Sequence, residues 1–117
     1  MNRTIKKAEL LKKKFNDIEI LKWGSNYSFD MIINATSLGL KNEDKINLEF
    51  EKFGENKFFY DVIYNPKETN FLKTAKKNNN KTENGKMMFI YQAHQSFTLW
   101  HGIMPEIDDK VIKLIDQ

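Results

Sequence analysis

Residues 29–36 read FDMIINAT, and residues 57–64 read KFFYDVIY. Both are short apolar runs that end in turn-forming residues, with little alternation between apolar and polar positions. Runs of this kind are typical of strands in a parallel sheet that helices cover on both faces. The two stretches therefore predict buried strands, and they are the starting point for the fold.

Helical patterns flank these strands. In the first of them Thr4 is a plausible N-cap, and the last is opened by Pro105. The third begins as the end of a strand that runs into a long helix. The four stretches are TIKKAELLKKKF (4–15), ETNFLKTAKKN (68–78), KMMFIYQAHQSFTLW (86–100) and PEIDDKVIKLID (105–116).

The remaining segments complete an α/β pattern. IEILKW, residues 18–23, is a further strand candidate, and residues 37–56 form a polar connection with room for a short helix. The polar stretch at residues 78–85 predicts a loop. Alternating strands and helices predict a layered α/β fold with a mostly parallel sheet.

Length and composition fit one ordinary domain. The chain has 117 residues, of which 40% are apolar and 30% charged. It has no cysteine, which excludes disulfides and thiolate metal sites. No apolar run is long enough to span a bilayer, and the chain does not open with a secretory signal. These features are those of a cytoplasmic protein.

Basic residues are concentrated at the start of the chain. Six of them lie within the first fourteen residues: Arg3, Lys6, Lys7, Lys12, Lys13 and Lys14. Such a cluster indicates either a phosphate-bearing ligand or a solvated helix face. Lys12–Lys14 are interpreted as a solvated face. A nucleic-acid partner is disfavoured, because the cluster has no interleaved aromatics and no recognisable motif.

Four stretches together resemble one family. They are NRTIKKAELLKKKF, DMIINATSLGL, YDVIYNPKETNFL and GKMMFIYQAHQSFTLWHGIMP. In order and spacing they resemble the C-terminal half of shikimate dehydrogenase, and the resemblance covers nearly the whole chain. It implies an NADPH-dependent reduction of 3-dehydroshikimate to shikimate, in the biosynthesis of aromatic amino acids. The implied architecture is an N-terminal substrate domain followed by a dinucleotide-binding Rossmann domain.

The resemblance implies a truncated Rossmann-like fold. The five glycines form no G-x-G-x-x-G turn, and residues 2–4 correspond to the end of the second Rossmann strand. Residues 1–117 are then one partial NADP-binding domain. The family's proton-transfer Lys and Asp belong to the N-terminal domain. No catalytic residue is therefore assigned to this chain, and Asp61 and Lys67 are expected to be structural.

The resemblance also implies NADP as the cofactor. Arg3 and Lys7 correspond to positions that bind the 2′-phosphate, where NAD enzymes carry an acidic residue. Gly85 corresponds to a close backbone approach to the nicotinamide, and Met88 packs beside its ring or fills the core. The implied cofactor-binding residues are Asn2, Arg3, Thr4, Lys7, Thr36, Ser37, Val62, Gly85 and Met88, with Asn34 and Ala35 lining the path.

Tyr64 and Gln92 resemble the family's substrate contacts. A phenol and an amide suit a ring that bears hydroxyls and a carboxylate. Without the resemblance, Tyr64 is an aromatic at the rim of the core and Gln92 a surface residue. His94 and His101 match no catalytic position and are expected to be packing or surface residues.

Two functional interpretations remain open. The chain is the NADP-binding part of a shikimate dehydrogenase-like oxidoreductase, expected to be inactive alone. The alternative is a non-catalytic remnant that acts as an oligomerising or partner-binding module. Loss of the first Rossmann strand would leave the strand at 29–36 with a free edge. Either residues 18–23 pair with that edge or two chains share it, and a homodimer is the preferred expectation. The expected small-molecule partners are NADP(H) and shikimate or 3-dehydroshikimate, with no nucleic acid and no membrane.

Overall fold

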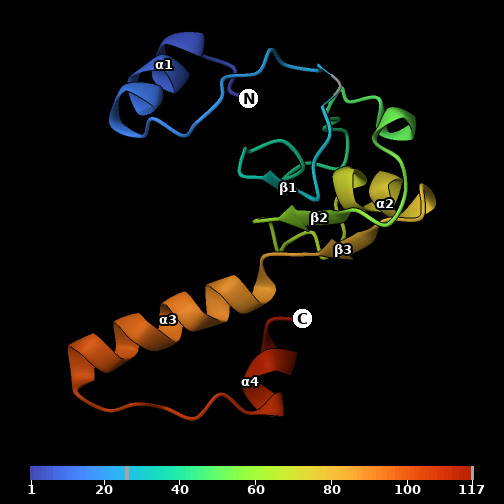
Figure 1. The fold of residues 1–117 in the computed structure, drawn as a ribbon. Helices are drawn as coiled ribbons and strands as arrows, with labels where there is room; N and C mark the ends of the chain where they lie inside the picture. The colour runs from blue at the N-terminus through green and yellow to red at the C-terminus, as the bar shows by residue number, and fades with distance from the viewer. Residues whose placement is uncertain (26, 117) are drawn as a thin grey trace.

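The protein is built on one three-stranded parallel sheet (Figure 1). The computed structural model describes residues 1–25 and 27–116. The strands are β1 (Met31–Asn34), β2 (Phe58–Asp61) and β3 (Lys81–Glu83), and they lie in the order β1-β2-β3. The register places Met31 opposite Phe58, and Phe58 opposite Lys81. The predicted α/β fold with a parallel sheet is therefore confirmed.

Two crossovers connect these parallel strands. A long segment with one 3₁₀ helix, η1 (Phe50–Phe53), joins β1 to β2, and helix α2 (Asn70–Lys77) joins β2 to β3. Both had been expected, η1 as the short helix within residues 37–56 and α2 within residues 68–78. Thr69 is the N-cap of α2, because its side chain accepts a hydrogen bond from the backbone N–H of Leu72.

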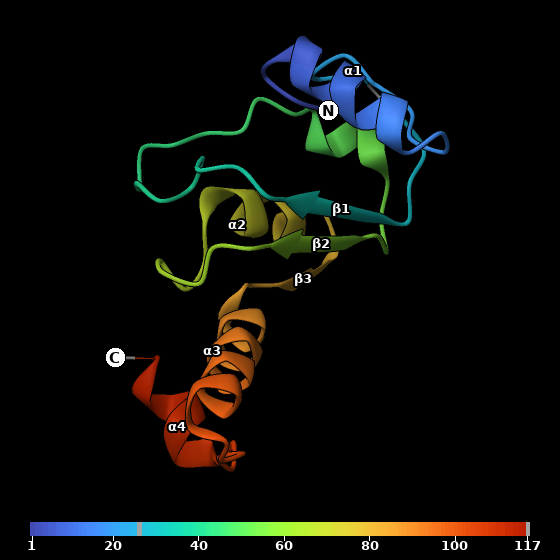
Figure 2. The ribbon, with the colours of Figure 1, turned by 90° about the vertical axis from the view of Figure 1, so that its left-hand side faces the viewer.

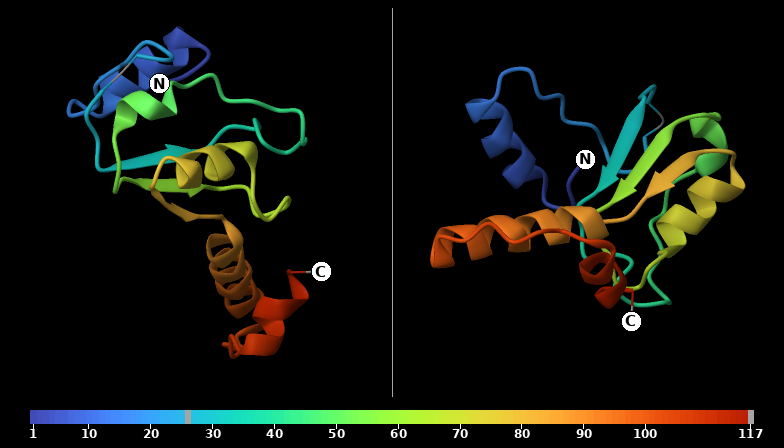
Figure 3. Two further views of the ribbon diagram at one scale, coloured as in Figure 1. Left: turned by 90° about the vertical axis from the view of Figure 1, so that its right-hand side faces the viewer. Right: turned by 90° about the horizontal axis from the view of Figure 1, so that it is seen from below.

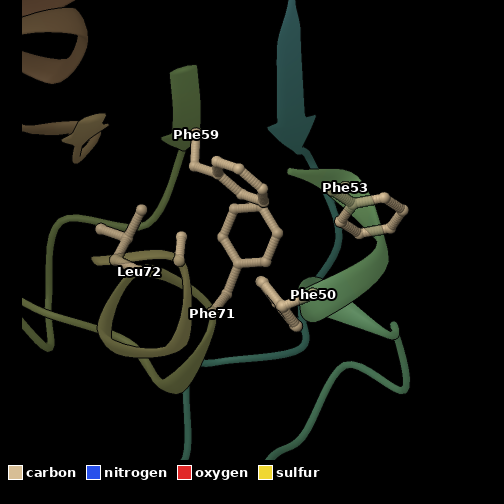
Figure 4. Close-up of a cluster of buried hydrophobic side chains, with 6 residues drawn as sticks. Phe50, Phe53, Phe59, Phe71 and Leu72 are labelled. Carbon is tan, nitrogen blue, oxygen red and sulfur yellow. The ribbon is translucent and has the colours of Figure 1, made fainter. Parts of the chain in front are cut away.

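A cluster of phenylalanines forms the core between the sheet and these crossovers (Figure 4). Phe59 of β2 is fully buried, and its ring centroid lies 5.4 Å from that of Phe71 and 5.7 Å from that of Phe50. The buried members of the cluster are Phe50, Phe53, Phe59, Phe71, Leu72 and Ala75. Burial of this many aromatic rings supplies the main hydrophobic stabilisation of the fold.

The opposite face of the sheet is open at β1 and half-buried at β2. Met31 and Ile33 of β1 are 45% and 55% exposed, while Ile32 packs against the phenylalanine cluster. Figures 1 and 3 show that helix α1 (Ile5–Lys14) and helix α3 (Lys86–His101) extend away from the sheet. None of the residues of α1 is buried. The alternation along β1 therefore separates a packed face from an open one, and the expectation that helices cover both faces of the sheet is wrong at β1.

The strand expected at residues 18–23 is not formed. This segment has no regular secondary structure, and within the described residues β1 is hydrogen-bonded only to β2. A strand needs a neighbour to satisfy its backbone groups, and no described strand lies beside this segment. The alternative in which residues 18–23 pair with the edge of β1 is therefore wrong for the single chain.

The loop expected at residues 78–85 contains β3 instead. Its polar sequence has low strand propensity, but Asn80 fixes it beside β2. The side-chain oxygen of Asn80 accepts from the backbone N–H of Lys57 at 2.8 Å, and its Nδ2 donates to the carbonyl of Gly54 at 3.2 Å. Pairing with β2 thus overrides the local preference for a loop.

The C-terminal elements begin at different residues from those expected. The third helical stretch contains no strand end, because β3 ends at Glu83 and α3 is helical from Lys86. The last helix, α4 (Asp109–Leu114), is capped by Asp108, whose Oδ1 accepts from the N–H groups of Lys110 and Val111. Pro105 precedes the helix and does not open it. Within the described residues, no helix has the length and apolarity needed to cross a membrane.

Candidate functional site

The carboxyl ends of β1 and β2 lie at one edge of the sheet (Figure 2). In open α/β sheets this edge is where ligands bind. Asn34 ends β1, Asp61 ends β2, and Gly85 follows β3. The loops that leave these positions carry about half of the residues singled out from the sequence.

Asp61 is fully buried and accepts three hydrogen bonds at this edge. Its Oδ1 accepts from Nδ2 of Asn34 and from the backbone N–H of Ile63, both at 3.1 Å. Its Oδ2 accepts from the hydroxyl of Thr69 at 2.7 Å. Donors from three parts of the chain thus satisfy a carboxylate that would be costly to bury alone. This arrangement agrees with the structural role expected of Asp61.

The loop after β1 is shaped by Asn34. Its Oδ1 accepts from both the N–H (3.1 Å) and the hydroxyl (2.8 Å) of Thr36, and its Nδ2 donates to the carbonyl of Leu38 at 2.9 Å. The Thr36 hydroxyl also accepts from the N–H of Leu38. Because its proton is donated within the loop, this hydroxyl could only accept a further hydrogen bond from a ligand. Ser37 is exposed at the tip.

Asp44 holds the far end of the same loop. Its Oδ2 accepts from the N–H groups of Gly39 and Lys41, each at 3.1 Å. These backbone hydrogen bonds, with that of Gly39 the larger, lower the pKa of the Asp44 carboxyl below its ordinary value. Nδ2 of Asn70, at the start of α2, donates to the carbonyl of Asp44 at 3.1 Å. The loop is therefore linked to the start of α2 at both ends, through Asp61 to Thr69 at one end and from Asp44 to Asn70 at the other.

Val62 and Gly85 are in direct contact. A Cβ added at Gly85 would lie 2.5 Å from the carbonyl carbon of Val62 and closer still to its oxygen. The backbone N–H of Gly85 donates to the carbonyl of Ile63 at 3.2 Å. The backbones of two positions predicted from the sequence to meet the same part of the cofactor thus lie side by side.

Tyr64 stacks on Phe89 of α3. The ring centroids are 4.5 Å apart, and the planes are inclined by 24°. Phe89 and Gln92 are three residues apart on this helix, so they share a face. Gln92 and Met88 are both exposed at the same end of α3. The structure therefore brings Tyr64 to the first turns of α3, where the other predicted contacts lie.

The predicted 2′-phosphate residues lie at the start of α1. Oδ1 of Asn2 accepts from the N–H of Thr4 at 2.8 Å, and Thr4 occupies the N-cap position without a capping side-chain hydrogen bond. Arg3 and Lys7 are exposed. Within residues 1–25 and 27–116, no hydrogen bond or ion pair joins Asn2, Arg3, Thr4 or Lys7 to the sheet. These residues therefore make no direct polar contact with the carboxyl edge among the described residues.

The two histidines lie on α3, away from the sheet edge. Nε2 of His94 is 2.9 Å from the carbonyl oxygen of Pro105, and the ring of His101 lies 4.4 Å from that of Phe97. His94 links α3 to the segment before α4, which is the packing role expected of it. His101 is exposed.

Sequence reasoning missed Thr69 and Phe89. Thr69 is buried and joins the α2 N-terminus to Asp61, while Phe89 supports the ring of Tyr64. An Asp inside the apolar run FFYDVIY was a visible signal that a buried partner must exist. No comparable signal marked Phe89, which reads as one more apolar helix residue.

Parallel strands joined by crossovers, with polar side chains at the carboxyl edge, define part of a Rossmann-like α/β fold. No protein-family model matches the chain. The shikimate dehydrogenase (NADP(+)) of Pelagibacter ubique is 63% identical over 115 residues, which are 98% of this chain and 43% of that protein. The enzyme of the same name from Caldicellulosiruptor saccharolyticus is 45% identical over 88% of this chain and 40% of its own length.

Solved structures agree with these relatives. A shikimate dehydrogenase in complex with NADP+ matches 74% of this chain and 30% of its own, with 43% identity and a TM-score of 0.65. The Thermus thermophilus enzyme in complex with NADP(H) and shikimate matches 97% of this chain and 42% of its own, with 29% identity and a TM-score of 0.79. The chain is therefore strongly homologous to shikimate dehydrogenases over nearly its whole length. It spans about two fifths of the length of the curated relatives it matches.

Proposed function

We propose that this chain is the NADP-binding part of a shikimate dehydrogenase-like oxidoreductase, with residues 1–117 as one partial Rossmann domain. The reaction is the reduction of 3-dehydroshikimate to shikimate, with a hydride from NADPH added to the ketone carbon and a proton to its oxygen. The observation that carries the proposal is the carboxyl edge of the sheet. There the loop after β1, the Val62–Gly85 contact and Tyr64 converge in a chain that is 63% identical to a known member of the family.

The donor set of this chain fits a phosphorylated dinucleotide. Arg3 is the only arginine in a chain of nineteen Lys and Arg residues, and its planar fork suits a phosphate better than a lysine does. Lys7 lies one helical turn further along α1 and adds a second positive charge. We infer that these two side chains bind the 2′-phosphate and that no acidic residue competes for the ribose there.

Each remaining residue orients a different part of the ligands. Ser37 offers an exposed hydroxyl at the loop tip, and the backbones of Val62 and Gly85 present peptide groups to the nicotinamide amide. The Tyr64 phenol, supported by Phe89, and the Gln92 amide contact the substrate's hydroxyls and carboxylate. NADPH supplies the hydride when it is bound. This chain contributes binding and orientation, with no residue assigned to proton transfer.

Isothermal titration calorimetry with NADP+ and NAD+ tests the proposal. Wild type should bind NADP+ weakly but about tenfold or more tighter than NAD+, since hydrogen bonds between charged groups contribute about 1.5–3 kcal/mol. Arg3→Ala should remove most of this preference and leave NAD+ binding unchanged. Lys13→Ala is the matched control, because it also removes one exposed positive charge from α1.

Equal affinity of the wild type for the two nucleotides would contradict the assignment of Arg3. An equal loss in Arg3→Ala and Lys13→Ala would show that only the overall charge matters. The 117-residue chain alone should show no oxidation of shikimate above background. We place this function in the cytoplasm, in keeping with the absence of cysteine.

The free edge of β1 supports a second proposal, a homodimer in which two chains pair along this strand. The carbonyls of Asp30 and Asn34 accept from the N–H groups of Phe58 and Val62, so by alternation the backbone groups of Met31 and Ile33 face the free edge. Unpaired edges of this kind are templates for pairing with another chain. In a non-catalytic remnant, this edge would be the oligomerising element.

Light scattering across the micromolar range measures the dimer directly. Ile33→Lys should shift the mass towards the monomer, because a lysine blocks edge pairing. Leu99→Lys is the control, since Leu99 is 83% exposed but lies on α3. A wild type that stays monomeric over the whole range, or a dimer that only Leu99→Lys dissociates, would rule out the β1 edge.

A further inference from the structure

The buried carboxylate of Asp61 is bonded to both loops that form the candidate site. Through Asn34 it reaches the loop after β1, and through the N–H of Ile63 it reaches the segment that leads to Tyr64. We propose that Asp61 is the positioning residue of the carboxyl edge, and that it transmits the placement of the α2 N-terminus to both loops. This inference rests on the proposed function, because it deepens the account of the same site.

The connection through Asn34 leaves no freedom in the side-chain amide. Its two N–H groups donate to Asp61 and to the carbonyl of Leu38, and its oxygen accepts twice from Thr36. An amide offers two donors and two acceptor sites, so every one is used. A rotation of this amide would place its donors against the N–H of Thr36. The position of the Asp61 carboxylate therefore fixes the conformation of the loop.

The connection to α2 runs through Thr69. Its hydroxyl donates to Asp61 at 2.7 Å and accepts from the N–H of Leu72 at 3.4 Å. Thr69 is only 2% exposed, and its methyl group would lie 3.2 Å from a Cβ added at Gly39. The N-terminus of α2 thus touches the loop after β1 both through the hydrogen-bonded chain and by direct packing.

A carboxylate suits position 61 better than an amide. Asp61 accepts from three donors, those of Asn34, Ile63 and Thr69. The oxygen of an asparagine in its place could accept from two of them, and its NH2 group would have to donate to the third partner. We expect that partner to be the Thr69 hydroxyl, which can also accept, because the two other donors share one oxygen. Asp61→Asn therefore preserves the shape of the side chain, reverses the hydrogen bond to Thr69 and leaves the buried hydroxyl proton of Thr69 without its acceptor.

The experiment compares Asp61→Asn, Thr69→Val and Thr69→Ser with wild type. Thr69→Val keeps the volume and loses the hydroxyl, while Thr69→Ser keeps the hydroxyl and should restore wild-type behaviour. Thr74→Val is the matched control, because it deletes a hydroxyl from α2 that bonds only the carbonyl of Asn70. All are the full 117-residue chain, measured under conditions where urea titration shows them to be folded.

Two measurements follow from the proposal. The amide resonances of Thr36 and Leu38 should shift in ¹H–¹⁵N spectra of Asp61→Asn and Thr69→Val, although position 69 is more than thirty residues away in the sequence. The affinity for NADP+ should fall several-fold, about three- to tenfold, since one arm of the network is worth about one hydrogen bond. Thr69→Ser and Thr74→Val should change neither.

A purely structural role would lower the urea midpoint and leave both measurements unchanged, and that result would overturn the proposal. Should Asp61→Asn fail to fold, the same two measurements on Thr69→Val test the proposal. Failure of wild type to bind NADP+ would refute the proposed function alone. The amide resonances would then decide whether Asp61 positions the loop, with unshifted resonances counting against it.

Discussion

The contact between Gly85 and Val62 allows the effect of one added methyl group to be worked out. Gly85 has φ −77° and ψ 3°, a conformation that alanine also adopts, so the substitution Gly85→Ala carries no backbone penalty. The new Cβ would lie 2.5 Å from the carbonyl carbon of Val62. Carbon atoms pack at about 3.5–4.0 Å, so the start of α3 must move by about 1 Å away from the end of β2.

This displacement has two energetic consequences. Overpacking of a rigid contact costs about 1–3 kcal/mol, and here the obstacle is backbone, which cannot rotate away. A movement of 1 Å also breaks the hydrogen bond from Gly85 to the carbonyl of Ile63, now 3.2 Å long, at a further cost of about 1 kcal/mol. We expect Gly85→Ala to lower the free energy of unfolding by about 2–4 kcal/mol.

Urea denaturation followed by circular dichroism measures this loss. Gly102→Ala is an informative control, because Gly102 has φ +66° with no atom within 4 Å of an added Cβ. Its cost is conformational only, about 1–2 kcal/mol. Gly85→Ala should therefore be the more destabilising of the two. A Gly85→Ala protein as stable as wild type, or more stable than Gly102→Ala, would refute the steric argument.

Two further predictions concern acid stability and the core. The lowered pKa of the Asp44 carboxyl means that its hydrogen bonds stabilise the fold fully above the ordinary value of 3.8, and that this contribution is lost as the pH falls through the folded-state pKa. Urea midpoints measured between about pH 5 and about pH 2 should therefore fall less steeply in Asp44→Asn than in wild type. Parallel curves for the two proteins would contradict this prediction. Phe59→Ala should cost about 3–5 kcal/mol because the ring is fully buried, whereas Phe97→Ala, at a ring that is 42% exposed, should cost about 1 kcal/mol or less in the same urea titration.

The strands and helices that the sequence predicted correctly are those with a strong local pattern. The apolar runs around β1 and β2 and the amphipathic stretch of α2 carry their structure in their own residues. β3 could not be found this way, because Lys81, Thr82 and Glu83 have a polar, loop-like composition. Its strand conformation comes from pairing with β2 and from the bonds of Asn80. The reverse holds for residues 18–23, where a strand-like pattern has no neighbour to pair with.

Some residues of the candidate site were predictable from the sequence and others were not. The resemblance pointed to Val62, Gly85 and Tyr64, and the structure adds the physical reasons why they lie together. Thr69 and Phe89 act through other side chains, so no local pattern of residue types reveals them. Their roles depend on contacts between segments that are distant in sequence. Such contacts become visible only once the sheet is assembled.

The exposure of α1 bears on the strength of nucleotide binding. Arg3 and Lys7 lie at the exposed start of a helix with no buried residue, whereas Ser37 and Gly85 belong to a loop and a turn held by several hydrogen bonds. A dinucleotide that engages both groups must fix the position of α1 relative to the sheet, and this ordering reduces the net affinity. The selectivity for a 2′-phosphate is unaffected, because NADP+ and NAD+ share the same ordering cost. The structure therefore predicts binding that is weak in absolute terms and yet discriminates between the two nucleotides through Arg3.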